Sequence, residues 1–204
     1  MSESTLDPNR PIAELLVDTS ALLQGHFQLS SGLHSDRYVQ CALLLQHPRL
    51  AERVGQELAA RLHRAGVAAD VVVGPALGGV VVAHEVARAL GVRSVFAERA
   101  GADLALRRGF AITQGERVLI AEDVITTGLS ARETAALCRA AGGRVVGYVA
   151  VVERAQDHGL TPCFALWQVR PRTFAAAECP LCAAGSAPIK PGSRGVAAGA
   201  GKGA

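Results

Sequence analysis

The chain has 204 residues, of which half are hydrophobic and 19% are charged, and its 21 Lys and Arg residues against 18 Asp and Glu residues give a net charge of +3. This composition predicts a globular domain with a sizeable core, and the small positive charge gives no reason to expect a nucleic-acid partner. Both lysines, Lys190 and Lys202, lie near the C-terminus. A lysine Schiff base, a Walker-type phosphate loop and a kinase-type catalytic lysine are therefore excluded before residue 190.

No apolar run reaches the roughly 18 residues that a membrane-spanning helix needs, so no membrane partner is expected. The polar start MSESTLDPNRP lacks the basic-then-apolar pattern of a secretory signal. The five cysteines are scattered without the spacing of a disulfide framework, which is typical of a reducing compartment. These features predict a cytoplasmic location.

Apolar residues at helical spacing predict helices over 11–23, 48–65, 78–91 and 129–141. Short runs of β-branched and other apolar residues predict strands over 70–74, 93–97, 116–124, 144–152 and 164–169. Strands and helices alternate, and the strand interiors are continuously apolar. The expected fold class is therefore α/β, with a Rossmann-like parallel sheet covered by helices on both faces.

The expected domain organisation is a single domain over 1–182, in which about residues 1–45 form a small N-terminal hood that carries a substrate loop. Residues 183–204 are rich in Gly, Ala and Pro and contain both lysines. This composition predicts a disordered tail.

The strand predicted over 116–124 ends in two adjacent carboxylates, Glu122 and Asp123, and the turn TTG at 126–128 leads to a helix near Ser130. Neighbouring side chains of a strand point to opposite faces, so the two acids are expected to share one ligand only where the strand has opened into a loop. Hydroxyls and N–H groups at a helix N-terminus bind phosphate, and carboxylates accept hydrogen bonds from sugar hydroxyls. The segment predicts a ribose 5-phosphate site; the alternative is a helix cap beside solvated acids.

A second turn, GPALGG at 74–79, also joins a predicted strand to a predicted helix. Its glycines permit unusual backbone angles, and N–H groups at the start of the helix can face a diphosphate. Tight packing of strand against helix is the alternative explanation for these glycines.

The string EDVITTGLS at 122–130 resembles the signature loop of the type I phosphoribosyltransferases, which bind 5-phosphoribosyl 1-diphosphate. GHFQLSSGLHSDRYVQ at 25–40 is similar to the N-terminal substrate loop of those members that use orotate. GPALGGV at 74–80 stands where the family has its diphosphate loop, and VVERAQDHG at 151–159 resembles the strand end whose arginine meets orotate. The resemblance extends over about residues 15–182.

This resemblance implies that ribose 5-phosphate is transferred from 5-phosphoribosyl 1-diphosphate to orotate, giving orotidine 5′-phosphate and diphosphate in pyrimidine biosynthesis. It implies Mg²⁺ as a cofactor, held by substrate and water without a direct protein ligand, and a homodimer. The catalytic residues implied are Glu122 and Asp123, which hold the ribose hydroxyls, and Arg99. The residues implied to bind the sugar diphosphate are Leu77, Gly78, Arg99, Arg107, Arg108, Glu122, Asp123, Val124, Ile125, Thr126, Thr127, Gly128, Leu129 and Ser130.

The segment 98–110 is where the family places a loop that closes over the reacting centre. Its cations are Arg99, Arg107 and Arg108. A guanidinium can neutralise a departing diphosphate but does not readily donate a proton. The loop is therefore expected to act by charge and by excluding water. The alternatives are a solvated basic loop and a loop that serves the neighbouring subunit.

Arg154 follows the strand predicted over 144–152, at the same sheet edge as the acids, and a guanidinium can pair with the carboxylate of orotate. An ion pair with Asp157 or Glu153 is the alternative. Residues 30–38 are expected to form a polar loop between two helices, which could close over the base or be an ordinary surface turn. The residues implied to bind orotate are Thr126, Arg154, Ser30 and Tyr38.

Cys179 and Cys182 form CPLC, a spacing typical of metal ligands. A structural zinc site needs four ligands, and no second pair stands near them in the sequence. Ordinary thiols are therefore favoured over zinc, and a disulfide is a further alternative. His26 and His34 are candidates for catalysis because they belong to the segment with the polar loop.

Two other functions fit the same phosphate site. One is a phosphoribosyltransferase for a purine or other base, which would not need Arg154 to meet a carboxylate. The other is a non-catalytic regulator that binds 5-phosphoribosyl 1-diphosphate. A regulator of transcription would need a DNA-binding domain or a strong basic patch, and the sequence shows neither.

Overall fold

The computed structural model describes residues 6–29, 31–101, 103–154 and 157–191. Two compact units divide the chain, one comprising Met1–Ala21 and Gln40–Arg170 and the other Leu22–Val39 and Pro171–Ala204. None of the helices in the described part of the chain combines the length and apolar character that a membrane crossing requires.

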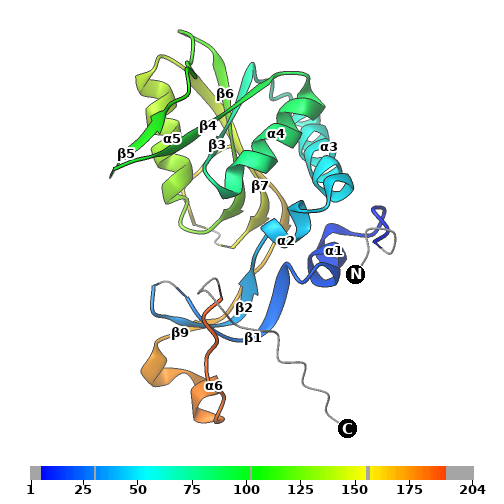
Figure 1. The fold of residues 1–204 in the computed structure, drawn as a ribbon, viewed down its shortest axis with the longest axis vertical. Coiled ribbons are helices and arrows are strands. Elements are labelled where there is room, and N and C mark those ends of the chain that lie inside the picture. The colour runs from blue at the N-terminus through cyan, green and yellow to red at the C-terminus, as the bar shows by residue number, and fades with distance from the viewer. Residues whose placement is uncertain (1–5, 30, 102, 155–156, 192–204) are drawn as a thin grey trace. The chain divides into compact units, whose positions relative to one another are not determined.

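A six-stranded sheet forms the centre of the first unit, in the spatial order β5-β4-β3-β6-β7-β8 (Figure 1). Its strands are β3 (Val71–Pro75), β4 (Arg93–Ala100), β5 (Asp103–Leu106), β6 (Arg117–Ile125), β7 (Arg144–Glu153) and β8 (Cys163–Gln168). β5 is antiparallel to β4, and the other neighbouring strands are parallel. Every residue of β3 is buried, as expected for a strand covered on both faces.

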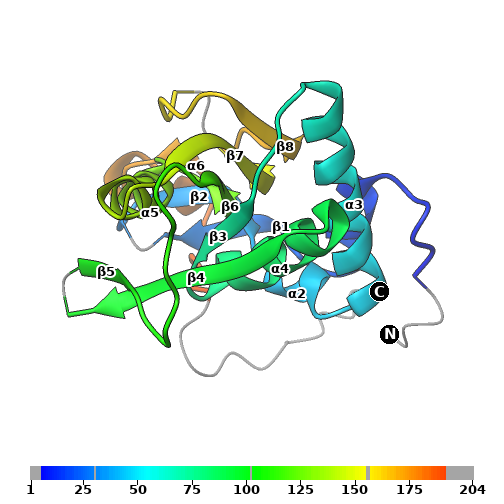
Figure 2. The same ribbon diagram turned by 90° about the horizontal axis from the view of Figure 1, so that it is seen from above.

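The helices of the first unit are α1 (Ile12–Asp18), α2 (Ala42–Leu45), α3 (Pro48–Arg64), α4 (Gly78–Leu90) and α5 (Leu129–Ala140). α5 lies against one face of the sheet, and α3 and α4 lie on the other (Figures 1 and 2). On the α5 face, Val118 and Ile120 of β6 share a buried cluster with Ala131 and Ala135. The α/β fold with a helix-covered parallel sheet is therefore confirmed.

The second unit contains a three-stranded antiparallel sheet in the order β1-β2-β9. Its strands are β1 (Leu22–Gln28), β2 (His34–Val39) and β9 (Thr173–Phe174). A short 3₁₀ helix (Ala176–Glu178) and α6 (Pro180–Ala183) follow β9. The chain then returns to β1, where Ile189 forms a parallel bridge with Phe27. The tail expected from residue 183 is thus described as far as Pro191, and residues 192–204 lie outside the described residues.

The sequence misassigned the segment before residue 40. The helix expected over 11–23 ends at Asp18, and the polar loop expected between two helices is wrong, because residues 22–39 form the hairpin of β1 and β2. The apolar pair Leu22 and Leu23 suits a helix or a strand equally well. Pairing with β2 decides for the strand, with Leu22 opposite Val39.

The segment 98–110 is also more regular than expected. β4 continues to Ala100, three residues beyond the predicted strand end, and β5 folds back against it, with Arg99 opposite Leu104. Ladder hydrogen bonds between the two strands therefore order much of the segment that the sequence indicated as a loop. Ala102, at the tip, lies outside the described residues.

Candidate active site

Glu122 and Asp123 lie within β6 rather than in a loop. β6 pairs with β7 as far as Ile125, which lies opposite Glu153. The expectation that the strand opens at the acids is wrong, because β7 is long enough to continue the ladder beyond them. Strand alternation therefore sends the two carboxylates to opposite faces, Glu122 with Ile120 toward α5 and Asp123 toward α4.

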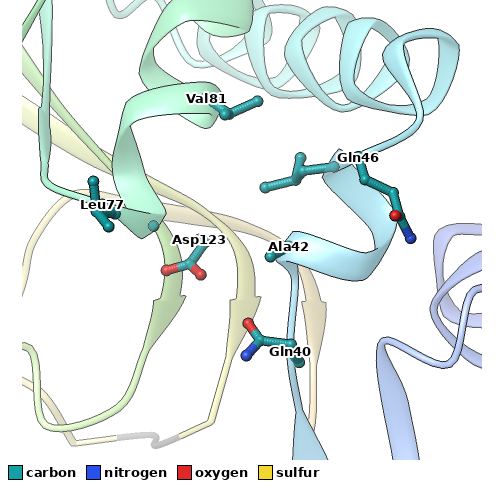
Figure 3. A pocket seen from close by; sticks show the side chains of 8 residues that line it. Gln40, Ala42, Gln46, Leu77, Val81 and Asp123 are labelled. Atoms are coloured by element: carbon teal, nitrogen blue, oxygen red, sulfur yellow. The ribbon is translucent and has the colours of Figure 1, made fainter. Parts of the chain in front are cut away.

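Asp123 borders a pocket of about 340 Å³ in the first unit, a size suited to a small molecule. Figure 3 shows its carboxylate beside the first turn of α4, with Gln40 and Ala42 across the pocket. The backbone N–H of Val124 donates a 2.8 Å hydrogen bond to Asp123 Oδ1. The residues that line the pocket are Gln40, Ala42, Leu45, Gln46, Leu77, Gly78, Val81 and Asp123.

The glycines of the turn at 74–79 are required by close packing. A Cβ at Gly78 would stand 2.5 Å from Asp123 Oδ1, and a Cβ at Gly79 would stand 2.6 Å from the carbonyl oxygen of Ala121. A Cβ at Gly74 would be 2.3 Å from the carbonyl oxygen of Gly79. The tight-packing explanation therefore holds, and the same packing places the start of α4 directly beside Asp123.

Glu122 belongs to a second hollow, at the N-terminus of α5. The hollow is lined by Glu122 and by 124–131. α5 begins at Leu129 after Gly128, whose φ of 74° lies in the left-handed region that favours glycine. The N-cap residue makes no side-chain capping bond, and the N–H of Leu129 donates a long hydrogen bond of 3.4 Å to Thr127 Oγ1. The other N–H groups of the first turn and the positive end of the helix dipole are available to an anion.

Arg132 holds the turn before α5 in place. Its Nη1 donates to the carbonyl oxygens of Thr127 at 2.9 Å and His158 at 2.7 Å. His158 is buried and lies 3.6 Å from Glu153 through Nε2. Sequence reasoning missed these hydrogen bonds of Arg132, because Arg132 meets His158 only after β6, α5 and β7 have assembled. The only local signal was the arginine itself, one turn into α5.

Both acids of the site have raised pKa values. Burial, and then the neighbouring charge of Asp123, raises the pKa of Glu122 to about 8. Burial also raises the pKa of Asp123, against the opposing effect of backbone hydrogen bonds. Carboxyl groups with raised pKa values at the carboxyl end of a parallel strand are typical of a functional site.

The three arginines expected to neutralise diphosphate have carboxylate partners. Arg99 donates to Glu133 of α5 at 2.6 Å. Arg108 donates to Glu98 at 3.1 Å, and Arg107 lies 3.8 Å from the same side chain. Arg107 and Arg108 are mostly exposed, so these pairs are weak and leave both guanidinium groups accessible to a ligand.

The residues expected to bind orotate are distributed between the two units. The N–H of Arg154 donates to Ile125 O at 2.8 Å, which places the backbone of Arg154 beside the end of β6, at the residue that precedes Thr126. Tyr38 lies on β2 in the second unit. Ser30 lies outside the described residues. Sequence reasoning missed the pocket residues Gln40 and Gln46, whose only signal was their position at and after the end of the motif 25–40.

Comparison with known proteins identifies the class of this site. The phosphoribosyl transferase domain model matches residues 43–161, which contain β3, β6, the hollow at α5 and all of the residues that line the pocket at Asp123 except Gln40 and Ala42. The chain belongs to the phosphoribosyltransferase family.

Curated relatives and solved structures refine this result. The orotate phosphoribosyltransferase of Heliobacterium modesticaldum is 48% identical over 90% of this chain and 97% of its own length. That of Pelotomaculum thermopropionicum is 50% identical over 90% of this chain and 96% of its own length. The solved orotate phosphoribosyltransferase of Mycobacterium tuberculosis H37Rv is 27% identical, with a TM-score of 0.62, over 78% of this chain and 96% of its own. Within the family, the chain falls among the orotate phosphoribosyltransferases, as its motifs predicted.

Proposed function

We propose that this chain transfers ribose 5-phosphate from 5-phosphoribosyl 1-diphosphate to orotate, giving orotidine 5′-phosphate and diphosphate. The observation that carries the proposal is the end of β6, where the buried Glu122 and the partly buried Asp123 stand between the N-terminus of α5 and the first turn of α4. The identity to orotate phosphoribosyltransferases over nine-tenths of the chain supports orotate as the acceptor.

The substrate's phosphate groups are assigned to the two helix starts. The 5′-phosphate binds the N–H groups and hydroxyls of 126–130, where the helix dipole attracts negative charge. The diphosphate binds over the turn at Leu77 and Gly78, beside the pocket that Asp123 borders. β6 pairs with β3 only as far as Ile120, so the edge of β6 that carries the acids is open on that side. The ribose lies along this open edge and reaches both hollows, with its hydroxyls donating to Glu122 and Asp123.

The reaction builds positive charge on the ribose ring as the bond from C1 to the diphosphate oxygen breaks. Hydrogen bonds from the substrate hydroxyls and the developing cation favour the ionised forms of Glu122 and Asp123, which stabilise that charge. Arg99, Arg107 and Arg108 stabilise the negative charge on the departing diphosphate. A nitrogen of the orotate ring then forms the new bond at C1 and loses its proton, which passes to the departing diphosphate or to solvent. Closure of 98–110 keeps water from this carbon.

The donor set beside Asp123 fits Mg²⁺. Its carboxylate and the carboxamide oxygen of Gln40 are the hard oxygen donors that this ion prefers, and Mg²⁺ usually retains several waters. When bound, the ion would neutralise charge on the diphosphate. Asp123 and Gln40 would orient it, mainly through its water ligands.

Orotate carries a carboxylate, for which Arg154 supplies a planar cation near Thr126. Ser30 and Tyr38 are assigned to the same base on the strength of the motif at 25–40. We further propose that the protein acts in the cytoplasm as a homodimer. All five cysteines are free, which agrees with a reducing compartment.

The test is the loss of orotate absorbance in the presence of 5-phosphoribosyl 1-diphosphate and Mg²⁺. Turnover of orotate and none of adenine is expected. In Arg154→Leu, the KM for orotate should rise at least about tenfold while the KM for the sugar diphosphate changes little, because about 1.4 kcal/mol of carboxylate pairing is lost. Turnover of adenine alone would contradict the assignment. So would binding of the sugar diphosphate without turnover of any base.

A further inference from the structure

Four side chains of metal-ligating type converge in the second unit. They are His26, His34, Cys179 and Cys182, and their ligand atoms all lie within 4.8 Å of one another. His26 Nε2 is 2.9 Å from His34 Nδ1 and 3.4 Å from Cys179 Sγ. Cys182 Sγ is 3.4 Å from His34 Nδ1 and 3.7 Å from His26 Nε2.

The nitrogen–sulfur separations are close to the edges of a tetrahedral zinc site. Zinc bonds to nitrogen and sulfur place the ligand atoms about 3.4 Å apart for two nitrogens, about 3.6 Å for nitrogen and sulfur, and about 3.8 Å for two sulfurs. The three nitrogen–sulfur distances given above are within about 0.2 Å of that value. The nitrogen pair, at 2.9 Å, is closer and would separate slightly around an ion.

The second unit's own elements position each of the four ligands. His26 stands where the β1–β2 register shifts between Gln24 and Phe27, and such a bulge re-aims a side chain relative to the regular strand. His34 is the first residue of β2. Cys179 precedes α6, and Cys182 lies within that helix. The sequence placed these pairs about 150 residues apart, and only pairing within this unit unites them.

A hydrogen bond selects the form of His26 that can bind a metal. His26 Nδ1 lies 3.0 Å from the carbonyl oxygen of Ser186, which can only accept. The ring therefore carries a hydrogen on Nδ1, and in the neutral ring Nε2 presents its lone pair to the cluster. Donation of the distal ring hydrogen to a carbonyl is the usual support of a histidine ligand.

The cluster occupies the interior of a unit that has few buried apolar side chains, among them Leu22 and Phe27. His26, His34 and Cys179 are 6%, 5% and 2% exposed. Both cysteines are free thiols. A small unit that cannot bury enough apolar surface is commonly stabilised by a disulfide or a metal, and this one has four converging ligands instead of a disulfide.

We propose that these four residues bind a structural Zn²⁺ ion, which fastens the segment after β9 to the β1–β2 hairpin. Two thiolates and two imidazoles provide the four ligands of a structural zinc site. They do not suit Mg²⁺, which prefers oxygen ligands. Four protein ligands leave no position for substrate, so the role is structural. None of the four ligands is among the residues assigned to the sugar diphosphate or to orotate, and the proposal does not depend on the proposed reaction.

The test is the metal content of the full, untagged chain, purified without added metal and measured by inductively coupled plasma mass spectrometry. About one zinc per chain is expected, with an X-ray absorption spectrum that fits two sulfur neighbours at about 2.3 Å and two nitrogen neighbours at about 2.0 Å. This measurement requires no variant and no substrate. Absence of bound zinc, both as purified and after addition of Zn²⁺, would overturn the proposal.

Variants assign the ligands. Cys179→Ser combined with Cys182→Ser should lower the zinc content at least about tenfold, because thiolates are the stronger ligands. Cys163→Ser is the matched control, since Cys163 is a free, partly exposed cysteine of β8 in the first unit, and it should retain the metal. A chelator should lower the melting temperature of the wild type and of the control but leave that of the double variant unchanged. Zinc retained by the double variant would refute the assignment.

Discussion

The acids beside the start of strand β6 and those near its end are in opposite electrostatic states. At its start, Arg117 forms a two-pronged pair with Asp70 and lowers the pKa of Asp70 to about 2, and Arg93 lowers the pKa of Glu116. At its end, burial raises the pKa of Glu122 to about 8 and also raises that of Asp123.

The difference separates acids that support the fold from acids available to a ligand. An acid with an arginine partner at an exposed sheet edge is already satisfied, so it has little to offer a substrate. The raised pKa values of Asp123 and Glu122 mean that their ionised forms are disfavoured in the free protein. Substrate hydroxyls and cationic charge can stabilise those ionised forms. Three predictions test this contrast, in order of expected effect.

Gly79→Ala should cause the largest loss. The added Cβ would stand 2.6 Å from the carbonyl oxygen of Ala121, so the backbone beside Asp123 must move. A displacement of about 1 Å at a reacting centre can cost about a hundredfold in turnover, and a loss of this size is expected. Gly147→Ala is the control, because its Cβ meets β-sheet neighbours only at 3.4 Å or more. Equal steady-state rates for the two variants would contradict the close-packing argument.

Asp123→Asn should lower orotate turnover by about tenfold or more, because it removes a negative charge that stabilises the ribose cation. Asp70→Asn makes the same chemical change at the other end of the sheet. It should leave turnover unchanged, since Asp70 faces Arg117 rather than the pocket. Steady-state kinetics of both variants at saturating substrate provide the measurement. Near-normal turnover in Asp123→Asn would remove this residue from the mechanism.

Glu122→Gln should have the smallest effect, a change in the pH dependence of stability. The pKa of Glu122 is raised from 4.5 to about 8 in the folded chain, so the folded state holds this proton more tightly than the unfolded state. Its stabilising contribution is complete below about pH 4.5 and is lost as the pH rises to about 8.

Denaturant unfolding without substrate at pH 6 and pH 9 measures this effect. From pH 6 to pH 9, the free energy of unfolding of Glu122→Gln should rise relative to that of the wild type by about 3 kcal/mol at most, since one pKa unit corresponds to about 1.4 kcal/mol. Glu116→Gln is the control, because Arg93 lowers the pKa of Glu116 and both folded and unfolded states are ionised throughout this range. A pH-independent difference between wild type and Glu122→Gln would show that Glu122 ionises normally.

Much of the first unit could be predicted from local sequence. The run DVVVG and the pattern of 48–65 indicated β3 and α3 almost to the residue, because a buried parallel strand and an amphipathic helix have distinct patterns. EDVITTGLS likewise indicated the hollow at the start of α5, because its acids, hydroxyls and glycine turn are neighbours in the chain. The prediction was less accurate where pairing with another strand determines the secondary structure, as in the hairpin at 22–39 and in β5.

By itself, the sequence determined most of the strands and helices of the first unit, the family, and the segment at the end of β6 where acids and helix amides meet. These depend on short-range periodicity and on residues that are neighbours in the chain. The tertiary structure alone decided that Glu122 and Asp123 face opposite sides of the sheet, and that His26 and His34 meet Cys179 and Cys182. Both outcomes depend on strand pairing between distant segments. Side chains alternate along a strand, but which face of the sheet each side chain occupies is fixed only when neighbouring strands pair with it.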